Sequence, residues 1–338
     1  MTVLVTGGSG LVGSHVIAAL VAEGTRVRAL TRPANRAAVA SLGAEPVEGD
    51  VTDPAAWVRA SAGVSGIVHA AAYVAQRGTR EDFFAVNVGG TRCAVAAARA
   101  AGARLIHISS VAVYGRTGAY AAGAGGVAED FPFGAIWAHD YYAQSKRAAE
   151  AALWEAVARD GLAAVAIRPN VVYGERDRLF SPRVVRAIRG GLIPQIGTAS
   201  NRLSCVYADN VAAAVTLALT AAAAPGRAYN TTDDGPDALT QREFVDAFAD
   251  SLRVRVRRLR LPYALARVVV DWWARWQMLR HPGAYPGVGG AAVRFLAGQN
   301  PYVADRARRE LGWRPVCAPR DAVARTVRWI LANEKPGR

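Results

Sequence analysis

The sequence has few cysteines, almost no lysine and no long apolar run. Its three cysteines, Cys93, Cys205 and Cys317, lie far apart, which argues against disulfides and against the close ligand spacing of a zinc site. No apolar stretch reaches the roughly 18 residues that a transmembrane helix needs. The first residues also lack the charged and apolar segments of a signal peptide. We therefore expect a cytoplasmic protein that binds no metal ion.

Lys146 and Lys335 are the only lysines among 41 basic residues, so arginine carries almost all of the positive charge. A formal net charge of +14 would ordinarily suggest nucleic acid or an anionic surface as a partner. The arginines are scattered, however, and neither an aromatic-interleaved basic stripe nor a helix-turn-helix pattern accompanies them. We expect a dispersed basic surface and no nucleic-acid partner.

Short apolar segments alternate with alanine-rich helical segments through the first half of the 338 residues. Continuous apolar strands separated by helices are typical of a parallel sheet covered on both faces. The sequence thus predicts a doubly wound α/β fold of the Rossmann type. The expected strands cover residues 3–6, 27–30, 46–48, 66–69, 104–108 and 163–167, and the expected helices cover 13–23, 87–101 and 142–158.

The first predicted strand runs directly into a glycine-rich turn and then into a helix. The glycines recur every third residue, at Gly7, Gly10 and Gly13. A side chain there would block the tight turn, the approach of backbone N–H groups to a pyrophosphate, or close packing of the helix on the strand. This context predicts a dinucleotide site, whose residues are Gly7, Ser9, Gly10, Leu11, Val12 and Gly13.

The alternating pattern breaks up after about residue 175. We expect residues 1–174 to form the NAD(P)-binding domain and 205–232 to return to it. Residues 175–204 and 233–330 would then form a smaller C-terminal lobe that shapes a substrate site.

The second predicted strand ends in Thr31 and Arg32, without the acidic residue that usually binds the ribose hydroxyls of NAD. Arg32, with Arg36 as a second candidate, could instead pair with the 2′-phosphate of NADP. The alternative is that Arg32 is one more surface arginine. We expect NADP, with NAD as the alternative cofactor.

Tyr142 and Lys146 are four residues apart and therefore lie on one helical face. In a chain that uses arginine almost everywhere, a lysine here suggests the need for a compact ammonium group. A nearby cation favours the tyrosine phenolate, so we expect Lys146 to lower the pKa of Tyr142. Ser110 follows the strand over 104–108, at the sheet edge where such folds bind ligands, and can hydrogen-bond a substrate carbonyl.

Several motifs stand in the order and spacing of a known enzyme group. Together they resemble the extended short-chain dehydrogenase/reductase superfamily, also known as the NAD-dependent epimerase/dehydratase superfamily, over most of the chain. The motifs are the glycine turn, Asp50-Val51, His69-Ala70-Ala71-Ala72, Asn87-Val88-Gly89-Gly90-Thr91, Ser109-Ser110 to Tyr114-Gly115, Tyr142 to Lys146, and Arg168-Pro169-Asn170-Val171-Val172-Tyr173-Gly174.

The resemblance implies roles for these residues. Ser110 and Tyr142 would act on the substrate, and Lys146 would hold the nicotinamide ribose. Asn87 would brace the sheet, and the superfamily's habit implies a homodimer. Cofactor contacts are implied for Asp50 and Val51 at the adenine, for Ala70 and Ala71 along the dinucleotide, and for Pro169 and Val172 near the nicotinamide.

The branch of the superfamily bears on the substrate. Sugar-nucleotide enzymes of this group commonly carry an asparagine where this chain has Val171, and Asn170 comes one residue early. The segments 206–211 and 300–313 look more like the 3β-hydroxysteroid dehydrogenase-like branch. The expected function is an NADP-dependent ketoreductase or alcohol dehydrogenase on a hydrophobic substrate, cyclic, steroid-like or polyketide-like. The alternatives are a nucleotide-sugar epimerase or dehydratase, for which Arg202 is suggestive, and a non-enzymatic redox sensor.

Two lobe segments have distinctive patterns. Arginines alternate with valines over residues 253–257, which predicts a strand with one cationic face. Residues 265–279 form an apolar helix with a single polar stripe, so this helix is expected to bury most of its circumference. Ordinary packing, a lid over a hydrophobic substrate and interfacial contact with a membrane all remain open for it.

Overall fold

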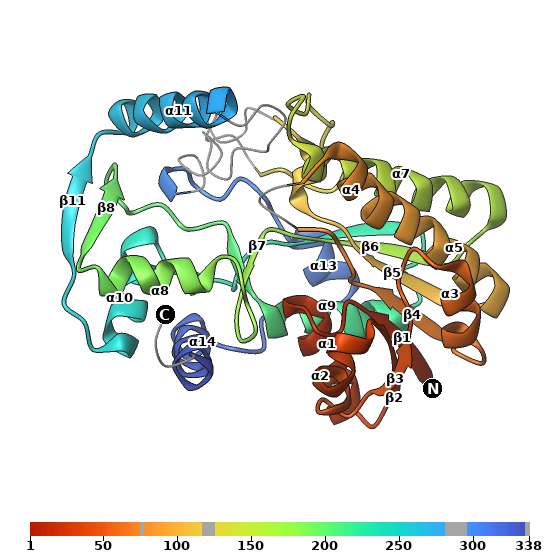
Figure 1. Ribbon diagram of the computed structural model, residues 1–338. Coiled ribbons are helices and arrows are strands. Elements are labelled where there is room, and N and C mark those ends of the chain that lie inside the picture. The colour runs from red at the N-terminus through yellow and green to blue at the C-terminus, as the bar shows by residue number, and fades with distance from the viewer. Residues whose placement is uncertain (75–77, 117–125, 281–295, 335–338) are drawn as a thin grey trace.

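The computed structural model describes residues 1–74, 78–116, 126–280 and 296–334 (Figure 1). Its centre is a seven-stranded sheet in the order β10-β6-β5-β4-β1-β2-β3, in which every neighbouring pair is parallel. This order confirms the predicted doubly wound Rossmann-type fold. The strands are β1 (Thr2–Thr6), β2 (Arg26–Thr31), β3 (Glu45–Glu48), β4 (Gly66–His69), β5 (Arg104–Ile108), β6 (Ala164–Pro169) and β10 (Arg227–Thr231).

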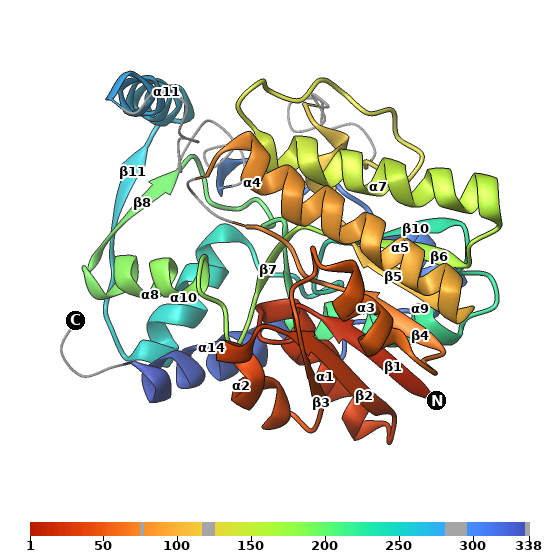
Figure 2. The same cartoon turned by 45° about the vertical axis from the view of Figure 1, so that its right-hand side comes forward.

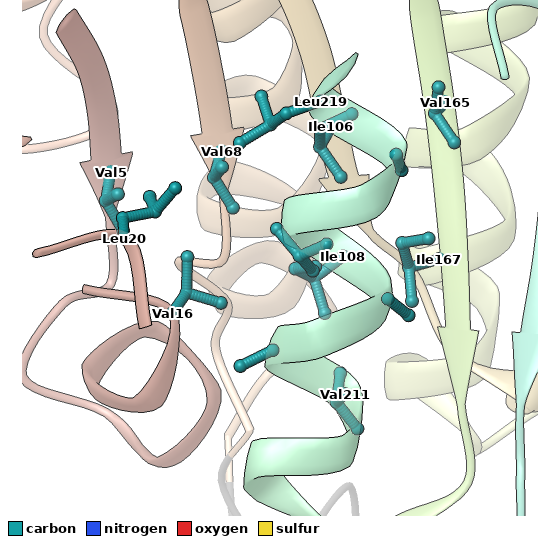
Figure 3. Close-up of a cluster of buried hydrophobic side chains, with 14 of the residues drawn as sticks. Val5, Val16, Leu20, Val68, Ile106, Ile108, Val165, Ile167, Val211 and Leu219 are labelled. Carbon is teal, nitrogen blue, oxygen red and sulfur yellow. The ribbon is translucent and has the colours of Figure 1, made fainter. Parts of the chain in front are cut away.

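Helices cover both faces of this sheet, and each face has its own apolar cluster (Figures 1 and 2). Figure 3 shows the first cluster, in which Val16 and Val211 from two helices meet strand residues such as Ile108. The second cluster is built around Trp57 and Leu153. One face is covered by α1 (Leu11–Ala22) and α9 (Ala208–Thr220), and the other by α3 (Pro54–Ser61), α5 (Gly90–Ala101) and α7 (Tyr141–Asp160).

Short elements connect these layers at the edge of the sheet where the strands end. A π-helical turn, η2 (Ala85–Gly89), joins α4 (Arg80–Phe84) to α5, and such turns are frequent at functional sites. The remaining short helices are η1 (Pro33–Asn35), α2 (Arg36–Ala40), η3 (Val111–Tyr114) and α13 (Asp305–Glu310).

The lobe has a separate apolar core around Phe244, Phe248 and Val185. Two small parallel ribbons run through it, β8 with β11 and β7 with β9. Its elements are β7 (Val171–Tyr173), α8 (Ser181–Arg189), β8 (Leu192–Ile196), β9 (Cys205–Tyr207), α10 (Gln241–Leu252), β11 (Arg257–Leu261), α11 (Tyr263–Arg280) and α14 (Pro319–Asn333).

The strand predicted over residues 253–257 is wrong. Arg253 has a left-handed conformation (φ 56°) that ends α10, and β11 begins only at Arg257. Val254 and Val256 pack into the lobe core while Arg253 and Arg255 stay exposed. The alternation therefore reflects burial on one side of an irregular segment, which a period of two cannot distinguish from a strand. Among the described residues, no helix is both long and apolar enough to cross a bilayer.

Candidate functional site

The glycine turn between β1 and α1 leaves no room for side chains. Gly7 has φ 70°, and a Cβ on it would lie 2.6 Å from the Ala71 nitrogen. A Cβ on Gly13 would lie 2.3 Å from the Gly7 oxygen, so helix and turn are in backbone contact. Gly10 is the N-cap of α1 and donates its N–H to the Gly7 carbonyl at 2.9 Å. The amino end of α1 thus has the close-packed geometry that suits a pyrophosphate.

The other predicted dinucleotide contacts lie around this turn. Ser9, Leu11 and Val12 are half-buried within it. The Ala70 and Ala71 amides donate to the backbone carbonyl and the hydroxyl of Thr6, each at 3.3 Å, which holds the end of β4 against Gly7. Two further candidates lie beyond the neighbouring strands: Pro169 closes β6, and Val172 sits in β7, where it packs against the cluster that contains α1.

Charged residues stand where β2 and β3 end. Asp50 accepts hydrogen bonds from the Thr52 amide and hydroxyl at 3.0 and 2.8 Å. The Thr52 amide, with a smaller contribution from Arg32, keeps the pKa of Asp50 below its usual value. Arg36 pairs with Glu48 at 2.9 Å, whereas Arg32 is exposed just after β2. Val51 receives the Trp57 indole N–H on its carbonyl at 2.8 Å.

Ser110, Tyr142 and Lys146 meet at the carboxyl end of β5. Ser110 is the N-cap of η3, and its hydroxyl accepts the Ala112 amide at 3.2 Å. Tyr142, in the first turn of α7, shares a hydrogen bond with the Ser110 side chain. One turn further along α7, the buried Lys146 ammonium donates to the Ile108 carbonyl at 2.7 Å.

The electrostatics of this trio differ from the sequence-based expectation. Burial raises the pKa of Tyr142, and the Ser110 hydrogen bond only partly opposes this effect. Burial also lowers the pKa of Lys146 to about 8. Lys146 was expected to lower the pKa of Tyr142, but its ammonium is directed to a backbone carbonyl, and desolvation of the phenol dominates. Tyr142 is therefore protonated at neutral pH.

Two buried histidines flank the same region. His69 ends β4, His107 lies opposite it in β5, and their rings stack with centroids 5.8 Å apart. Burial, together with the charge of Lys146, lowers the pKa of His69 to about 3 and holds that of His107 well below its usual value. Both rings are neutral at physiological pH.

Glu150, which none of the sequence motifs above singled out, anchors the helix that carries Tyr142 and Lys146. Its buried carboxylate forms an ion pair with the buried Arg168, accepts the Ser109 hydroxyl, and accepts the Trp154 indole at 3.0 Å. Its charge also raises the pKa of Lys146, against the effect of burial. The signal was present in the sequence, because Glu150 follows Lys146 by four residues and continues the same helical face.

Asn87 provides a second anchor for α7. It lies in η2, where its side-chain oxygen accepts the Tyr73 amide at 2.7 Å and its amide donates to the Ser145 hydroxyl at 2.9 Å. The resemblance implied that Asn87 braces the sheet. Its hydrogen bonds instead connect the segment after β4 to the helix that carries Tyr142 and Lys146.

Arg202 lies apart from this trio, in the lobe. It lines a pocket of about 400 Å³ with Gln299, Asn300 and Arg308, and Arg308 is paired with Asp233 at 2.6 Å. The Asn170 side chain is bonded to Ser204 and to the Val171 amide. Sugar-nucleotide enzymes commonly carry an asparagine at the next position, where this chain has Val171. The Asn170 amide is already hydrogen-bonded within the protein.

The glycine turn yields a prediction with an internal control. Gly7→Ala and Gly24→Ala both place a side chain at a left-handed φ, 70° and 75°, but a Cβ on Gly24 meets nothing within 4 Å. Gly24→Ala should lose about 1–2 kcal/mol of unfolding free energy to backbone strain, and Gly7→Ala should lose more, because its Cβ would also clash with the Ala70 and Ala71 backbone. Only Gly7→Ala should also weaken NAD(P) binding, by about tenfold or more, measured by calorimetric titration. Equal dinucleotide affinities in the two variants would contradict the assignment of this turn.

Known proteins with similar sequences point to one enzyme family. The model of the NAD dependent epimerase/dehydratase family matches residues 3–231. The chain is 32% identical over 330 residues to a 2-alkyl-3-oxoalkanoate reductase from Stenotrophomonas maltophilia, a match that covers 93% of this chain and 95% of that protein. It is 29% identical over 344 residues to a 3 beta-hydroxysteroid dehydrogenase/Delta 5→4-isomerase from Mycobacterium tuberculosis, with 98% and 90% covered.

A solved structure extends the likeness to three dimensions. The dTDP-glucose 4,6-dehydratase DesIV from Streptomyces venezuelae, solved with NAD bound, matches with a TM-score of 0.72 and 26% identity over 98% of each chain. The matches thus include reductases, dehydrogenases and a sugar-nucleotide dehydratase, and they span both the sheet domain and the lobe.

Proposed function

The chain belongs to the NAD-dependent epimerase/dehydratase family and is an NAD(P)-dependent enzyme of the extended short-chain dehydrogenase/reductase type; on this premise we propose that it is an NADP-dependent reductase of hydrophobic ketones. The observation that carries the proposal is the junction of Ser110, Tyr142 and Lys146 at the carboxyl end of β5. Two relatives with near full-length matches are a 2-alkyl-3-oxoalkanoate reductase and a 3 beta-hydroxysteroid dehydrogenase, which supports an apolar carbonyl or secondary alcohol as substrate.

When bound, the nicotinamide supplies the hydride to the carbonyl carbon or receives it from the alcohol. The turn over residues 7–13, with Ala70 and Ala71, would hold the dinucleotide, and Lys146, Pro169 and Val172 would contact its nicotinamide end. Ser110 hydrogen-bonds the substrate oxygen. Tyr142 gives its hydroxyl proton to that oxygen in reduction and takes it back in oxidation. Because burial raises the pKa of Tyr142, its hydroxyl is protonated at neutral pH and can donate its proton in the reduction.

An assay with two substrate classes tests this function. We expect NADPH to be consumed, as followed by its absorbance, with 2-alkyl-3-oxo acids or 3-oxosteroids. We expect no conversion of UDP- or dTDP-sugars when no external reductant is added. Inactivity on every hydrophobic ketone, combined with epimerised or dehydrated sugar nucleotides, would refute the proposal.

The second candidate is a nucleotide-sugar epimerase or dehydratase. The pocket at Arg202 favours it, because two guanidinium groups line a hollow of the lobe beside Asn300. Arg308 already has a carboxylate partner, Asp233, and the Asn170 amide is held by Ser204. These engagements favour the ketone reductase, and the sugar-nucleotide arm of the assay tests the alternative directly.

Arg32 determines the choice of cofactor in this proposal. A charge-assisted hydrogen bond contributes about 1.5–3 kcal/mol, so Arg32→Ala should weaken NADP binding by about tenfold to a hundredfold and leave NAD binding nearly unchanged. Arg26→Ala is the matched control, since Arg26 is an exposed arginine at the opposite end of the same strand. Calorimetric titration of both dinucleotides provides the measurement. Equal losses for NAD and NADP, or a wild-type preference for NAD, would show that Arg32 is only a surface residue.

A further inference from the structure

The part of the chain that the structure describes leaves a wide apolar face of helix α11 uncovered, so among these residues the expectation that the helix buries most of its circumference is wrong. It packs on the lobe through a narrow stripe of Ala266, Val270 and Ala274, which recur every four residues. The apolar side chains of its exposed face are Leu265 (51% exposed), Val268 (66%), Val269 (56%), Trp272 (64%), Trp273 (44%) and Leu279 (80%).

These side chains recur at helical spacing, so they form one continuous stripe along the helix. Leu265, Val269 and Trp272 are three or four residues apart, and Leu279 lies a further two turns along the same side. Surface hydrophobic residues are normally scattered singly, whereas a contiguous apolar patch marks an interaction site. The helix runs along the outer edge of the lobe, away from the central sheet (Figures 1 and 2).

The charge beside this stripe is almost entirely positive. Helix α11 contains three arginines and one acidic residue, Asp271, and Arg260 lies near the end of β11 that leads into it. Arg260 of β11 and Arg267, Arg275 and Arg280 of α11 are exposed. Asp271 neutralises only part of this charge through its contact with Arg267 at 3.7 Å. A second copy of the same surface would be repelled by like charge, whereas an anionic surface would be attracted.

We propose that α11 docks this enzyme on an anionic lipid surface. The helix lies parallel to the membrane, with Trp272 and its apolar neighbours in the headgroup region and the arginines against lipid phosphates. Tryptophan suits such a boundary because its ring has an apolar body and a polar N–H. This inference concerns location and does not depend on the proposed reaction.

The test is cosedimentation of the full chain with vesicles of phosphatidylcholine containing about 30% phosphatidylglycerol, an anionic lipid. We expect the wild type to bind these vesicles, to bind pure phosphatidylcholine far more weakly, and to be released by high salt. The variant Val268→Gln/Trp272→Gln/Leu279→Gln should bind at least about tenfold more weakly. Glutamine keeps a good helix propensity, so the helix itself should persist.

The control is Val58→Gln/Val316→Gln/Leu331→Gln, which removes exposed apolar side chains from other parts of the molecule (72%, 65% and 44% exposed) and should bind vesicles like the wild type. Both triple variants should keep wild-type turnover of a water-soluble ketone, so a failure of docking is distinguishable from a failure of the proposed function. Wild type that stays in the supernatant, or an α11 variant that binds equally well, would overturn the proposal. A wild-type dimer that only the α11 variant dissociates, seen by light scattering, would assign the face to self-association instead.

Discussion

Replacing Tyr142 with phenylalanine is expected to lower turnover by about two to four orders of magnitude, the range for removal of a general acid or base. Tyr142 lies in the first turn of α7 and shares a hydrogen bond with Ser110. Phenylalanine preserves the ring and removes only the hydroxyl, so the substrate oxygen would lose its proton donor while the fold is kept. Dinucleotide affinity should stay at the wild-type value, because the turn over residues 7–13 is untouched. Steady-state kinetics with a hydrophobic ketone, together with calorimetric titration of NADPH, measure the two effects separately.

The neighbouring tyrosine provides the control. Tyr141 precedes Tyr142 on the same helix, and its ring lies near Phe83, with centroids 6.4 Å apart. Tyr141→Phe removes the same atom one position away and should keep turnover close to the wild-type value. Near-normal turnover in Tyr142→Phe, or an equal loss in both variants, would remove Tyr142 from its assigned role.

Replacing Arg168 with methionine is expected to lower the free energy of unfolding by about 3–5 kcal/mol, the cost of leaving a buried charge without its partner. Arg168 and Glu150 are 3% and 2% exposed, and the Arg168 Nε donates to both Glu150 carboxylate oxygens at 3.1 and 3.2 Å. Arg168 also donates to the Tyr114 hydroxyl at 2.8 Å and to the Glu129 carbonyl at 3.0 Å. The variant would leave the Glu150 carboxylate buried beside Ser109, without its ion-pair partner. The midpoint of urea unfolding measures the loss.

An exposed ion pair of the same type provides the comparison. Arg36 contacts Glu48 at 2.9 Å with both side chains largely in solvent, so Arg36→Ala should cost about 0–1 kcal/mol. The double variant Arg168→Met/Glu150→Gln should lose less than the sum of its single variants, because the orphaned charge is gone. An Arg168→Met loss no larger than that of Arg36→Ala would show that the buried pair contributes little to stability.

Local and periodic features were predictable from the sequence. The strands and helices of the sheet follow from runs of apolar residues and their period, and the glycines at 7, 10 and 13 follow from backbone crowding at a strand-to-helix turn. The pairing of Tyr142 with Lys146 on one helical face needs only the geometry of a helix. The strand expected over residues 253–257 failed because alternating burial is not unique to strands.

By itself the sequence determined the doubly wound fold, the glycine turn and the Tyr142–Lys146 pair, because each depends on residues close together along the chain. Only the tertiary structure placed Ser110 against Tyr142, buried Glu150 with Arg168, and directed the Lys146 ammonium to the Ile108 carbonyl. It also reversed the expected direction of the Tyr142 pKa and left the apolar stripe of α11 in solvent. These outcomes depend on desolvation and on contacts between residues far apart in sequence, and no spacing along the chain encodes how deeply a group is buried.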